Sequence, residues 1–394
     1  MTRRDCLSLF AAAQLPSAPV ISSITPAQFW PNLDGRSVTW FHSRVSRIPG
    51  SPSLLMTLQT ITGSDVYGPV HQSYSTDLGL TWSDPAPVPG MGRRHHPENI
   101  QEGYCDTVPE PHAPSGTVLA IAQNVYYLNE KLTRPNDHRY PFYIVRRADG
   151  TWSPLRRIEW EHPEAAALYM SGASQRVTLP NGDVFLPISC GPYDRPDRSV
   201  CTTLASFDGD QFRIKAHGNI LRLSAGRGLL EPTMVSYGSR YLLSIRAENQ
   251  QGFVAASKDG LEWDTLRPWC WEDGEPLIMS TTQQRWMAHS GALYLVYTRK
   301  HPSNVDVMRW RAPLFLAEVD PKRLCLIRST ERVAMPLYGD GIHKGNEVEH
   351  LGNFHVTHIS PEETLITTGT VIPVNYRGAV RFSRIRWARP GQLA

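Results

Sequence analysis

The sequence predicts an all-β fold built from six repeated units. Its 394 residues include 32 Pro and 29 Gly, a composition typical of many turns between short strands. An apolar, β-type run of about ten residues recurs along the whole chain, usually entered through a turn with Gly, Pro or Ser. Long helical periodicity does not occur. Six units of paired strands, each with room for two more, predict a six-bladed β-propeller of four-stranded antiparallel blades.

The six apolar runs begin about 50 to 70 residues apart, a spacing typical of propeller blades. They are residues 51–60, 115–124, 182–190, 238–247, 290–299 and 361–369. Each is followed by a second strand-like run that ends in a turn and a large apolar residue. Those residues are Trp82, Trp152, Phe212, Trp263, Leu324 and Trp387. The alternating segment 36–43 is expected to supply the strand that closes the ring.

Short boxes at the blade turns support the same fold. Residues 75–82 read S-T-D-L-G-L-T-W, in which Asp77 is expected to accept hydrogen bonds from turn amides while Trp82 packs beneath the turn. Residues 257–263 are the same device one residue shorter, and residues 148–152 and 206–209 look like degenerate copies. Such a box stabilises a blade and carries no chemistry, so it predicts fold rather than function.

The remaining domain organisation is simple. No linker or low-complexity stretch divides residues 21–394, which are predicted to form one domain. Residues 1–20 contain Arg3 and Arg4 before a short apolar run, and so resemble a twin-arginine export signal, although Cys6 stands where such signals prefer Phe. We expect a periplasmic or secreted protein, with a frayed cytoplasmic N-terminus as the alternative. No run of 18 apolar residues occurs, so no membrane-spanning segment is expected.

The charge and cysteine content exclude several partners. A net charge of +3 with scattered Lys and Arg argues against binding to nucleic acid or a membrane surface. The five cysteines beyond the first segment have no metal-ligand spacing and are expected to be buried thiols, with a Cys190–Cys201 pair left open. No cofactor or catalytic metal is predicted; a structural calcium ion in the channel stays open.

Candidate functional residues lie just before or within the six runs, where the strands nearest the axis should converge on one mouth. Together they form an unusually polar ring. They are Arg47, Asp106, Glu110, His112, Gln175, Arg176, Glu231, Arg246, Gln284, Arg285, Asn353 and His355.

Several of these residues stand in motifs that resemble those of sialidases. Residues 46–49, S-R-I-P, are similar to the F/Y-R-I-P motif of that family, and residues 231–235 with 242–246 are similar to its E-P-x-x-V…L-L-x-x-R stretch. The resemblance spans most of the chain. It implies that Arg47, Arg246 and Arg311 grip a sugar carboxylate, with Arg309 a competing choice, and that Glu231 orients or activates a neighbour. Three planar, permanently charged guanidiniums suit a carboxylate ligand.

The last blade departs from this family pattern. Sialidases present a nucleophilic tyrosine in a stretch like G-Y-S-S-L, whereas residues 352–356 read G-N-F-H-V. The chain is therefore predicted to be a divergent member without the usual catalytic tyrosine. Tyr338 is a weak substitute in a loop, and Asp65 is either the general acid or an ordinary turn residue.

Histidines are dense in the first, second and last repeats, which become neighbours when a ring closes. Histidine titrates near neutrality and acts as general acid or base without a nucleophile. Among these histidines the leading candidate is His112, which lies directly before an apolar run. We assign proton transfer to His112 together with Asp106. Gln175, Arg176, Gln284 and His355 are assigned to substrate binding.

The sequence thus predicts an exported carbohydrate-active enzyme that hydrolyses the glycosidic bond of a terminal acidic sugar in an oligosaccharide or polysaccharide. Two alternatives stay open. One is a histidine-dependent polysaccharide lyase or rhamnosidase acting on rhamnosyl-glucuronate caps, in which arginines acidify the C5 proton of a uronate. The other is a glycan-binding propeller without catalysis, because a propeller that has lost its enzymatic activity would also lack the tyrosine.

Overall fold

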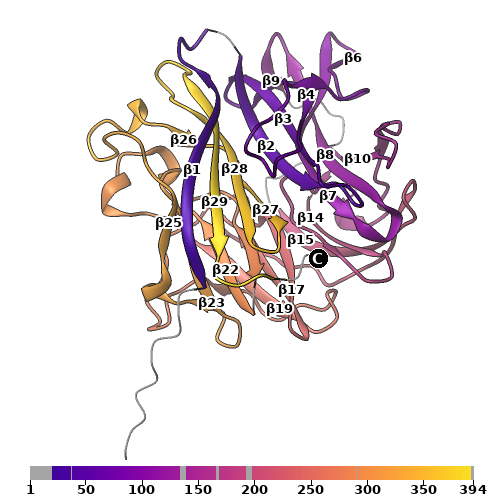
Figure 1. Cartoon of the computed structure of the whole chain (residues 1–394). Helices are drawn as coiled ribbons and strands as arrows, with labels where there is room; N and C mark the ends of the chain where they lie inside the picture. Colours follow the sequence, from indigo (N-terminus) through magenta and orange to yellow (C-terminus); the bar gives the residue numbers. More distant parts are fainter. Residues whose placement is uncertain are drawn as a thin grey trace, which may run out of the picture.

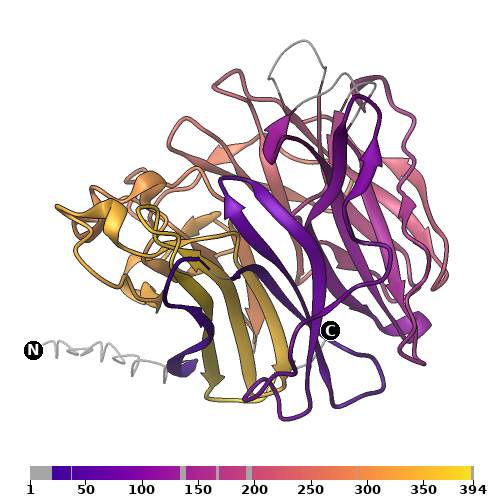
Figure 2. The same cartoon turned by 90° about the horizontal axis from the view of Figure 1, so that it is seen from above.

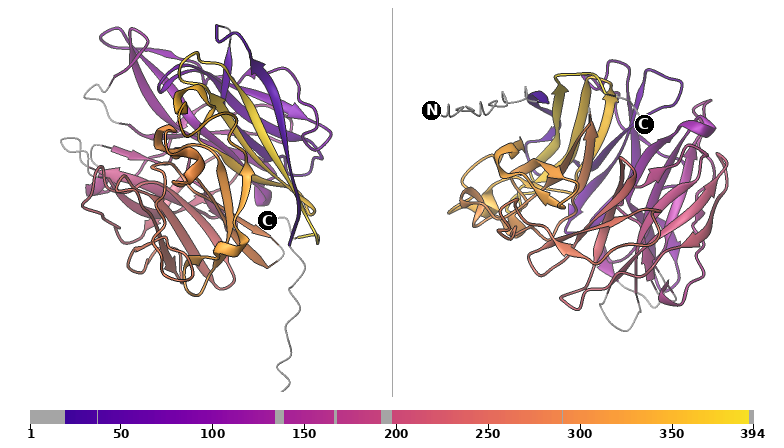
Figure 3. Two further views of the ribbon diagram at one scale, coloured as in Figure 1. Left: turned by 90° about the vertical axis from the view of Figure 1, so that its left-hand side faces the viewer. Right: turned by 90° about the horizontal axis from the view of Figure 1, so that it is seen from below.

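The structure, a computed structural model, describes residues 20–36, 38–133, 139–165, 168–191, 198–289 and 291–391. The predicted export signal lies outside these residues, apart from Val20. Within them the chain is all-β, with six antiparallel sheets arranged around a common centre (Figure 2 and Figure 3). The prediction of a six-bladed β-propeller is confirmed.

Each of the first three blades runs outward from an innermost strand. Blade one contains β2 (Thr39–Arg47), β3 (Leu54–Gly63), β4 (Val66–Ser75) and β5 (Ala86–Pro87). Blade two contains β6 (Arg94–His96), β7 (Ile100–His112), β8 (Thr117–Leu128), β9 (Lys131–Thr133), β10 (Pro141–Arg146) and β11 (Arg156–Arg157). Blade three contains β12 (Leu168–Met170), β13 (Val177–Thr178), β14 (Val184–Gly191), β15 (Ser199–Phe207) and β16 (Phe212–His217).

The last three blades follow the same order. Blade four contains β17 (Leu230–Tyr237), β18 (Arg240–Arg246), β19 (Gly252–Ser257) and β20 (Arg267–Pro268). Blade five contains β21 (Arg285–His289), β22 (Ala292–Tyr297), β23 (Leu314–Asp320), β24 (Cys325–Leu326) and β25 (Arg332–Met335). Blade six contains β26 (His350–Leu351), β27 (His355–Ser360), β28 (Glu363–Val371), β29 (Gly378–Trp387) and β1 (Ile21–Asn32).

Short 3-10 turns are the only helical elements among the described residues, and none of them is long and apolar enough to cross a membrane. They are η1 (Ala113–Ser115), η2 (Pro163–Ala165), η3 (Pro302–Asn304), η4 (Met308–Trp310), η5 (Arg328–Thr330) and η6 (Gly345–Glu347).

The six apolar runs of the sequence are the second strands of the blades: β3, β8, β14, β18, β22 and β28. These strands are almost wholly buried because both of their faces pack against neighbouring blades. The strands nearest the axis precede each run. Residues just ahead of the runs are therefore the ones that reach the axis.

The prediction for the closing strand is wrong. Residues 39–43 of segment 36–43 are the first part of β2, the innermost strand of blade one, and do not close the ring. Closure is made instead by β1, which pairs with β29 from Ile21 opposite Trp387 to Asn32 opposite Gly378. Figure 1 shows β1, in indigo, beside the yellow strands β29 and β28. Both segments are β-rich, so alternation alone did not distinguish them.

The core consists of apolar layers between neighbouring blades. Trp269 of blade four and Trp286 of blade five, for example, are buried with ring centroids 5.6 Å apart. Burial of aromatic side chains of this size is a major source of folding free energy. Cys190 and Cys201 lie on the paired strands β14 and β15 in the blade-three core, and both are free thiols.

The turn boxes are confirmed as hairpin devices. Asp77 accepts hydrogen bonds at Oδ1 from the backbone amides of Leu80 (3.1 Å) and Thr81 (2.9 Å), and Gly79 occupies the left-handed region at φ 81°. Trp82 packs edge-on against Phe382 of blade six. The box at Asp259 repeats the pattern with bonds of 2.9 and 2.8 Å from two turn amides. These turns hold blades together at the rim, away from the axis.

Candidate active site

A polar cavity of about 510 Å³ lies on the propeller axis. It receives side chains from every blade. Blades one and two supply His42, Tyr67 and Asp106, blade three supplies Met170, and the later blades supply Glu231, Arg246, Arg311 and Asn353. A polar cavity with convergent charged groups is the default ligand site of such a fold.

Bulges in the innermost strands turn several of these side chains into the cavity. His42 (φ 50°), Asp106 (φ 55°) and Glu231 (φ 45°) all occupy the left-handed region, and each lies where its strand slips register against the next. Bulges re-aim side chains in this way, and non-glycine residues in that region cost of order 1–3 kcal/mol each. Equivalent strain in three blades at one cavity indicates a functional site.

Two arginines approach the cavity beside Glu231. Arg246 donates from Nη1 to Glu231 Oε2 (2.8 Å) and from Nε to Thr281 Oγ1 (3.2 Å). Arg311 makes no such pair: its Nε is buried without a hydrogen-bond partner among the described residues. Burial, followed by the charges of Arg246 and Arg309, lowers the pKa of Arg311. Within the described part of the chain, the Nε–H group of Arg311 is thus a buried donor without a partner, although the charge of Glu231 also acts on this guanidinium.

Asp106 is held as a permanent anion. It accepts hydrogen bonds from Arg44 Nη2 (2.6 Å) and Asn353 Nδ2 (3.1 Å), and His42 Nε2 lies 3.6 Å away. Burial alone would raise the pKa of Asp106, but His42 and Arg44 outweigh it and hold that pKa well below its usual value. A carboxylate so tightly paired organises the cavity floor and is a poor proton donor.

Tyr67 forms a second polar cluster at the opposite side of His42. Its hydroxyl donates to Asp65 Oδ1 (3.1 Å), and its ring packs on that of His42 with centroids 4.6 Å apart. Burial, with Asp65 and Asp106, raises the pKa of Tyr67, whereas burial lowers the pKa of His42 to about 4. Near neutral pH the cavity thus contains an uncharged imidazole in contact with an uncharged phenol.

Two residues predicted to act at the site lie elsewhere. Arg47 stands at the far end of β2 from His42, opposite Leu54 on β3, and does not line the cavity. Its place near the axis is taken by Arg44, three residues earlier. His112 ends β7, where its ring bonds Ser115 Oγ (2.7 Å) and the carbonyl oxygen of Gly182 (2.8 Å). His112 therefore supports a turn, and its assignment to proton transfer is not supported by its position.

Four predicted binding residues lie near the axis but do not line the cavity. Gln175 bonds the backbone of Trp286, and Gln284 accepts from Ser244 Oγ (3.1 Å). Arg176 pairs with Glu110 (3.2 Å), and His355 is buried in the same layer. Gln175, Gln284 and Arg176 are thus bonded to other protein groups, whereas Nδ1 of His355 is buried without a partner among the described residues. Of the predicted site, only Asp106, Glu231, Arg246 and Arg311 meet in the cavity, together with the alternatives Asp65 and Arg309 and the last-blade Asn353.

The sequence analysis missed Tyr67 and His42 as site residues. Tyr67 lies on β4, the third strand of its blade, just after the turn at Asp65 (φ 59°), and both residues line the cavity. In the sequence, Tyr67 could have been noticed because it stands two residues after Asp65, a candidate general acid. Tyr338, the weak substitute, is 38% exposed and lies under Arg381 rather than in the cavity.

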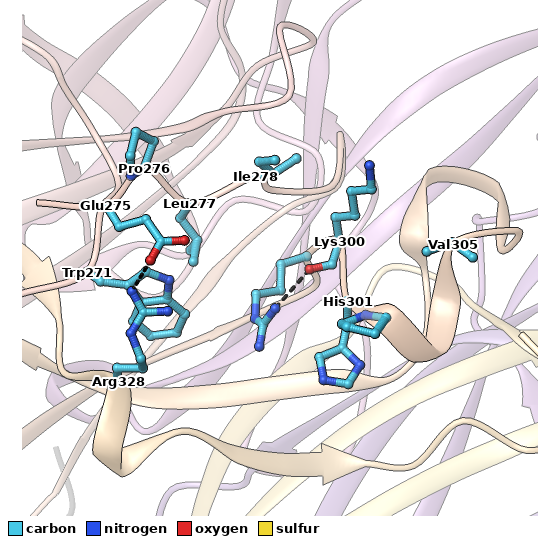
Figure 4. Close-up of a pocket in the computed structure, with 11 residues that line it drawn as sticks. Trp271, Glu275, Pro276, Leu277, Ile278, Lys300, His301, Val305 and Arg328 are labelled. Atoms are coloured by element: carbon cyan, nitrogen blue, oxygen red, sulfur yellow. Dashed lines mark hydrogen bonds and ion pairs between the residues drawn. The ribbon is translucent and has the colours of Figure 1, made fainter. Parts of the chain in front are cut away.

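A second pocket opens at the outer part of blade five, away from the axis. Figure 4 shows Arg328 pointing at Glu275, and their atoms lie 2.6 Å apart. Arg299 is likewise engaged with Glu331. Among the described residues no cluster of three or more His, Cys, Asp or Glu could hold a metal ion. The axial cavity is therefore the candidate active site.

Comparison with known proteins supports the fold assignment. No protein family model and no curated protein matches the sequence. Among solved structures, a Dyadobacter fermentans protein of unknown function matches with a TM-score of 0.65 and 12% identity, over 93% of this chain and 100% of that one. Trypanosoma rangeli sialidase with the inhibitor DANA matches with a TM-score of 0.64 and 12% identity, over 92% of this chain.

A Hadza microbial sialidase matches with a TM-score of 0.62 and 14% identity, over 88% of this chain. The match spans 60% of the trypanosomal sialidase chain and 66% of the Hadza sialidase chain. At these identities the likeness shows the fold alone. The chain has the six-bladed β-propeller fold found in sialidases.

Proposed function

We propose that the protein cleaves the glycosidic bond of a terminal, carboxylate-bearing sugar in its axial cavity. The observation that carries the proposal is Arg311, a partly buried guanidinium with an unpaired donor, beside the Arg246–Glu231 pair. A buried cation without a counterion is costly, and a bidentate carboxylate is its best ligand. The solved complex of Trypanosoma rangeli sialidase with sialic acid supports an acidic sugar as the ligand class at the level of the fold.

Hydrolysis is the reaction that we place first. The carboxylate would bind Arg311 and Arg246, bringing the glycosidic oxygen toward Asp65 and Tyr67. Asp65 would transfer a proton to the leaving oxygen as the bond from the anomeric carbon breaks, and Tyr67 would hold that carboxyl group through its hydroxyl. Water then bonds to the anomeric carbon and returns its proton to Asp65. Glu231 would orient Arg246 throughout.

The test is product analysis on a panel of acidic glycans that includes sialosides, glucuronides and rhamnosyl-glucuronate-capped polysaccharides. Wild-type protein is expected to release a free acidic sugar, detected by mass. Asp65→Asn should lower kcat by about 10²–10⁴-fold, the usual contribution of a positioned proton donor. Asp84→Asn, an exposed aspartate of the same blade, is the matched control. Release at equal rates by wild type and D65N would contradict the assignment.

Elimination is the second candidate, favoured by the contact between the uncharged His42 and Tyr67 rings. Nδ1 of His42 is buried without a partner and could take the C5 proton of a uronate. The bond from C4 to the leaving oxygen then breaks, Tyr67 gives that oxygen a proton, and a C4–C5 double bond forms. The arginines would stabilise the carboxylate as C5 loses its proton.

The same panel separates the two reactions. An ultraviolet-absorbing unsaturated uronate that disappears in His42→Gln would establish elimination, whereas a saturated sugar establishes hydrolysis. Binding of an acidic sugar by calorimetry without any product would instead leave a glycan-binding propeller.

A further inference from the structure

Beneath the axial cavity lies a layer of charged side chains that the proposed reaction does not use. Its arginines come from innermost strands or the segments that lead into them: Arg44 on β2, Arg176 before β13 and Arg285 on β21. All three are buried, with 0%, 6% and 1% of their surface exposed. Innermost strands face the axis, so these cations gather in the central channel.

Arg176 is fully satisfied. Its Nη atoms donate to the carbonyl oxygens of Val108 and Leu119, and its Nε lies 3.2 Å from Glu110 Oε2. A buried guanidinium that is paired and hydrogen-bonded in this way needs no further ligand. The hydrogen bonding of Arg176 can therefore be compared with that of the other two buried arginines.

Arg44 and Arg285 are not satisfied. Arg44 has one bond, from Nη2 to Asp106, and its Nε and Nη1 are buried without a partner. Arg285 has one long bond, from Nη1 to the carbonyl oxygen of Ser174 (3.4 Å), and its Nε and Nη2 are likewise unpartnered. Each unpaired donor on a buried charged group carries a desolvation cost that some ligand must offset.

The charges of this layer do not balance. Arg44, Arg176 and Arg285 supply three positive charges, and Asp106 and Glu110 supply at most two negative ones. Burial and, after it, the charge of Arg44 lower the pKa of Arg285 to about 9, so the two cations are close enough to repel each other. Burial, with Arg285 and Arg44, keeps the pKa of His355 well below its usual value, so this imidazole adds no charge. At least one positive charge lacks a counterion.

We propose that a small monovalent inorganic anion of the halide class binds in the channel between Arg44 and Arg285. The site offers four unpaired N–H donors and no free carboxylate, which suits an anion that only accepts hydrogen bonds. A small ion is required because the side chains around it are almost completely buried. Arg44 also holds Asp106, so the anion stabilises the floor of the axial cavity.

The direct test is anomalous diffraction from wild-type crystals soaked in sodium bromide. The expected result is a bromine peak on the axis within hydrogen-bond distance of Arg44 and Arg285. Channel density without an anomalous signal would mean water and would overturn the proposal. Bromide peaks confined to the surface would do the same, because they would show an adventitious ion only.

A solution test adds variants. At constant ionic strength, replacing gluconate by chloride should raise the melting temperature of the wild type by about 2 °C or more, because a ligand that binds only the folded state stabilises it. Arg285→Met should lose this increment. Arg47→Met, an arginine on β2 outside the channel, should keep it. An equal chloride effect in both variants would contradict the site, and wild-type diffraction remains decisive if R285M does not fold.

Discussion

Arg311 is the residue in which charge, burial and lack of a partner coincide. Its Nε has no hydrogen-bond partner among the described residues, whereas Arg246 beside it is neutralised by Glu231. An arginine of this kind costs stability in the empty protein and regains it when an anion binds. This unpaired donor is the reason that we propose an acidic ligand for the cavity.

Arg311→Met is expected to lower kcat/KM for an acidic glycoside by about 10–100-fold, since a hydrogen bond to a charged group contributes roughly 1.5–3 kcal/mol. Arg47→Met, which removes an arginine outside the cavity, should leave kcat/KM unchanged. Steady-state kinetics on both variants checks this prediction. A similar loss in both variants would mean that the effect is general rather than local.

The buried histidines make stability depend on pH. Burial lowers the pKa of His42 and of His358 from 6.5 to about 4, so between these pH values the unfolded chain binds protons that the folded chain does not. The contribution of each is full above pH 6.5 and is lost as pH falls toward 4, by at most about 3 kcal/mol. Urea unfolding at pH 7 and 4.5 should show a smaller loss in His358→Gln than in wild type. An equal loss would contradict the assignment.

Sequence analysis predicted individual site residues only in part. Glu231, Arg246 and Arg311 were predicted from the resemblance to sialidases, and all three line the cavity. Arg47 was predicted because residues 46–49 resemble a sialidase motif, whereas in the structure Arg44, just after the bulge at His42, is the β2 arginine that bonds Asp106 of the cavity. Such bulges leave no recognisable pattern in the sequence. Sequence alone therefore could not predict which residues of an inner strand reach the cavity and which lie above or below it along the axis.

At the scale of elements, the turn boxes are expected to contribute to stability and not to catalysis. Asp77 caps its turn through backbone bonds to Leu80 and Thr81, far from the axial cavity. Asp77→Ala should lower the free energy of unfolding by about 1 kcal/mol, the usual contribution of one hydrogen bond, without changing kcat. Asp84→Ala, in the loop that follows the box, should change neither. Chemical denaturation and activity assays on both variants check this prediction. A loss of kcat in D77A without a loss of stability would contradict a purely stabilising role for the box.

The blades themselves were predictable because each repeats one pattern: an apolar second strand entered through a turn. Closure was not predictable, because β1 and segment 36–43, which contains the start of β2, are both β-rich and only the spatial order of strands separates them. The tyrosine of the site was missed for a related reason. Tyr67 belongs to a third strand, which in most blades lies away from the axis.

At the scale of the whole molecule, ring closure depends on β1. This strand pairs with β29 along nearly its full length and shields what would otherwise be an exposed edge. Deleting residues 20–32 along with those before them should yield aggregated protein, whereas deleting only residues 1–19 should leave the melting temperature within about 2 °C of the full chain. Size-exclusion chromatography and thermal melts check this. A soluble, cooperative product of the longer deletion would show that closure does not need β1.

The fold and the cavity together support one central claim: the axial site selects a sugar by its carboxylate. The most direct measurement compares wild-type binding and cleavage for two ligands that differ only there, a uronic acid glycoside and its neutral hexose counterpart. We predict that the acidic glycoside binds and is cleaved at least about 10-fold better, because Arg311 gains its missing partner only from the carboxylate. Equal affinity and equal turnover for the two ligands would contradict the claim.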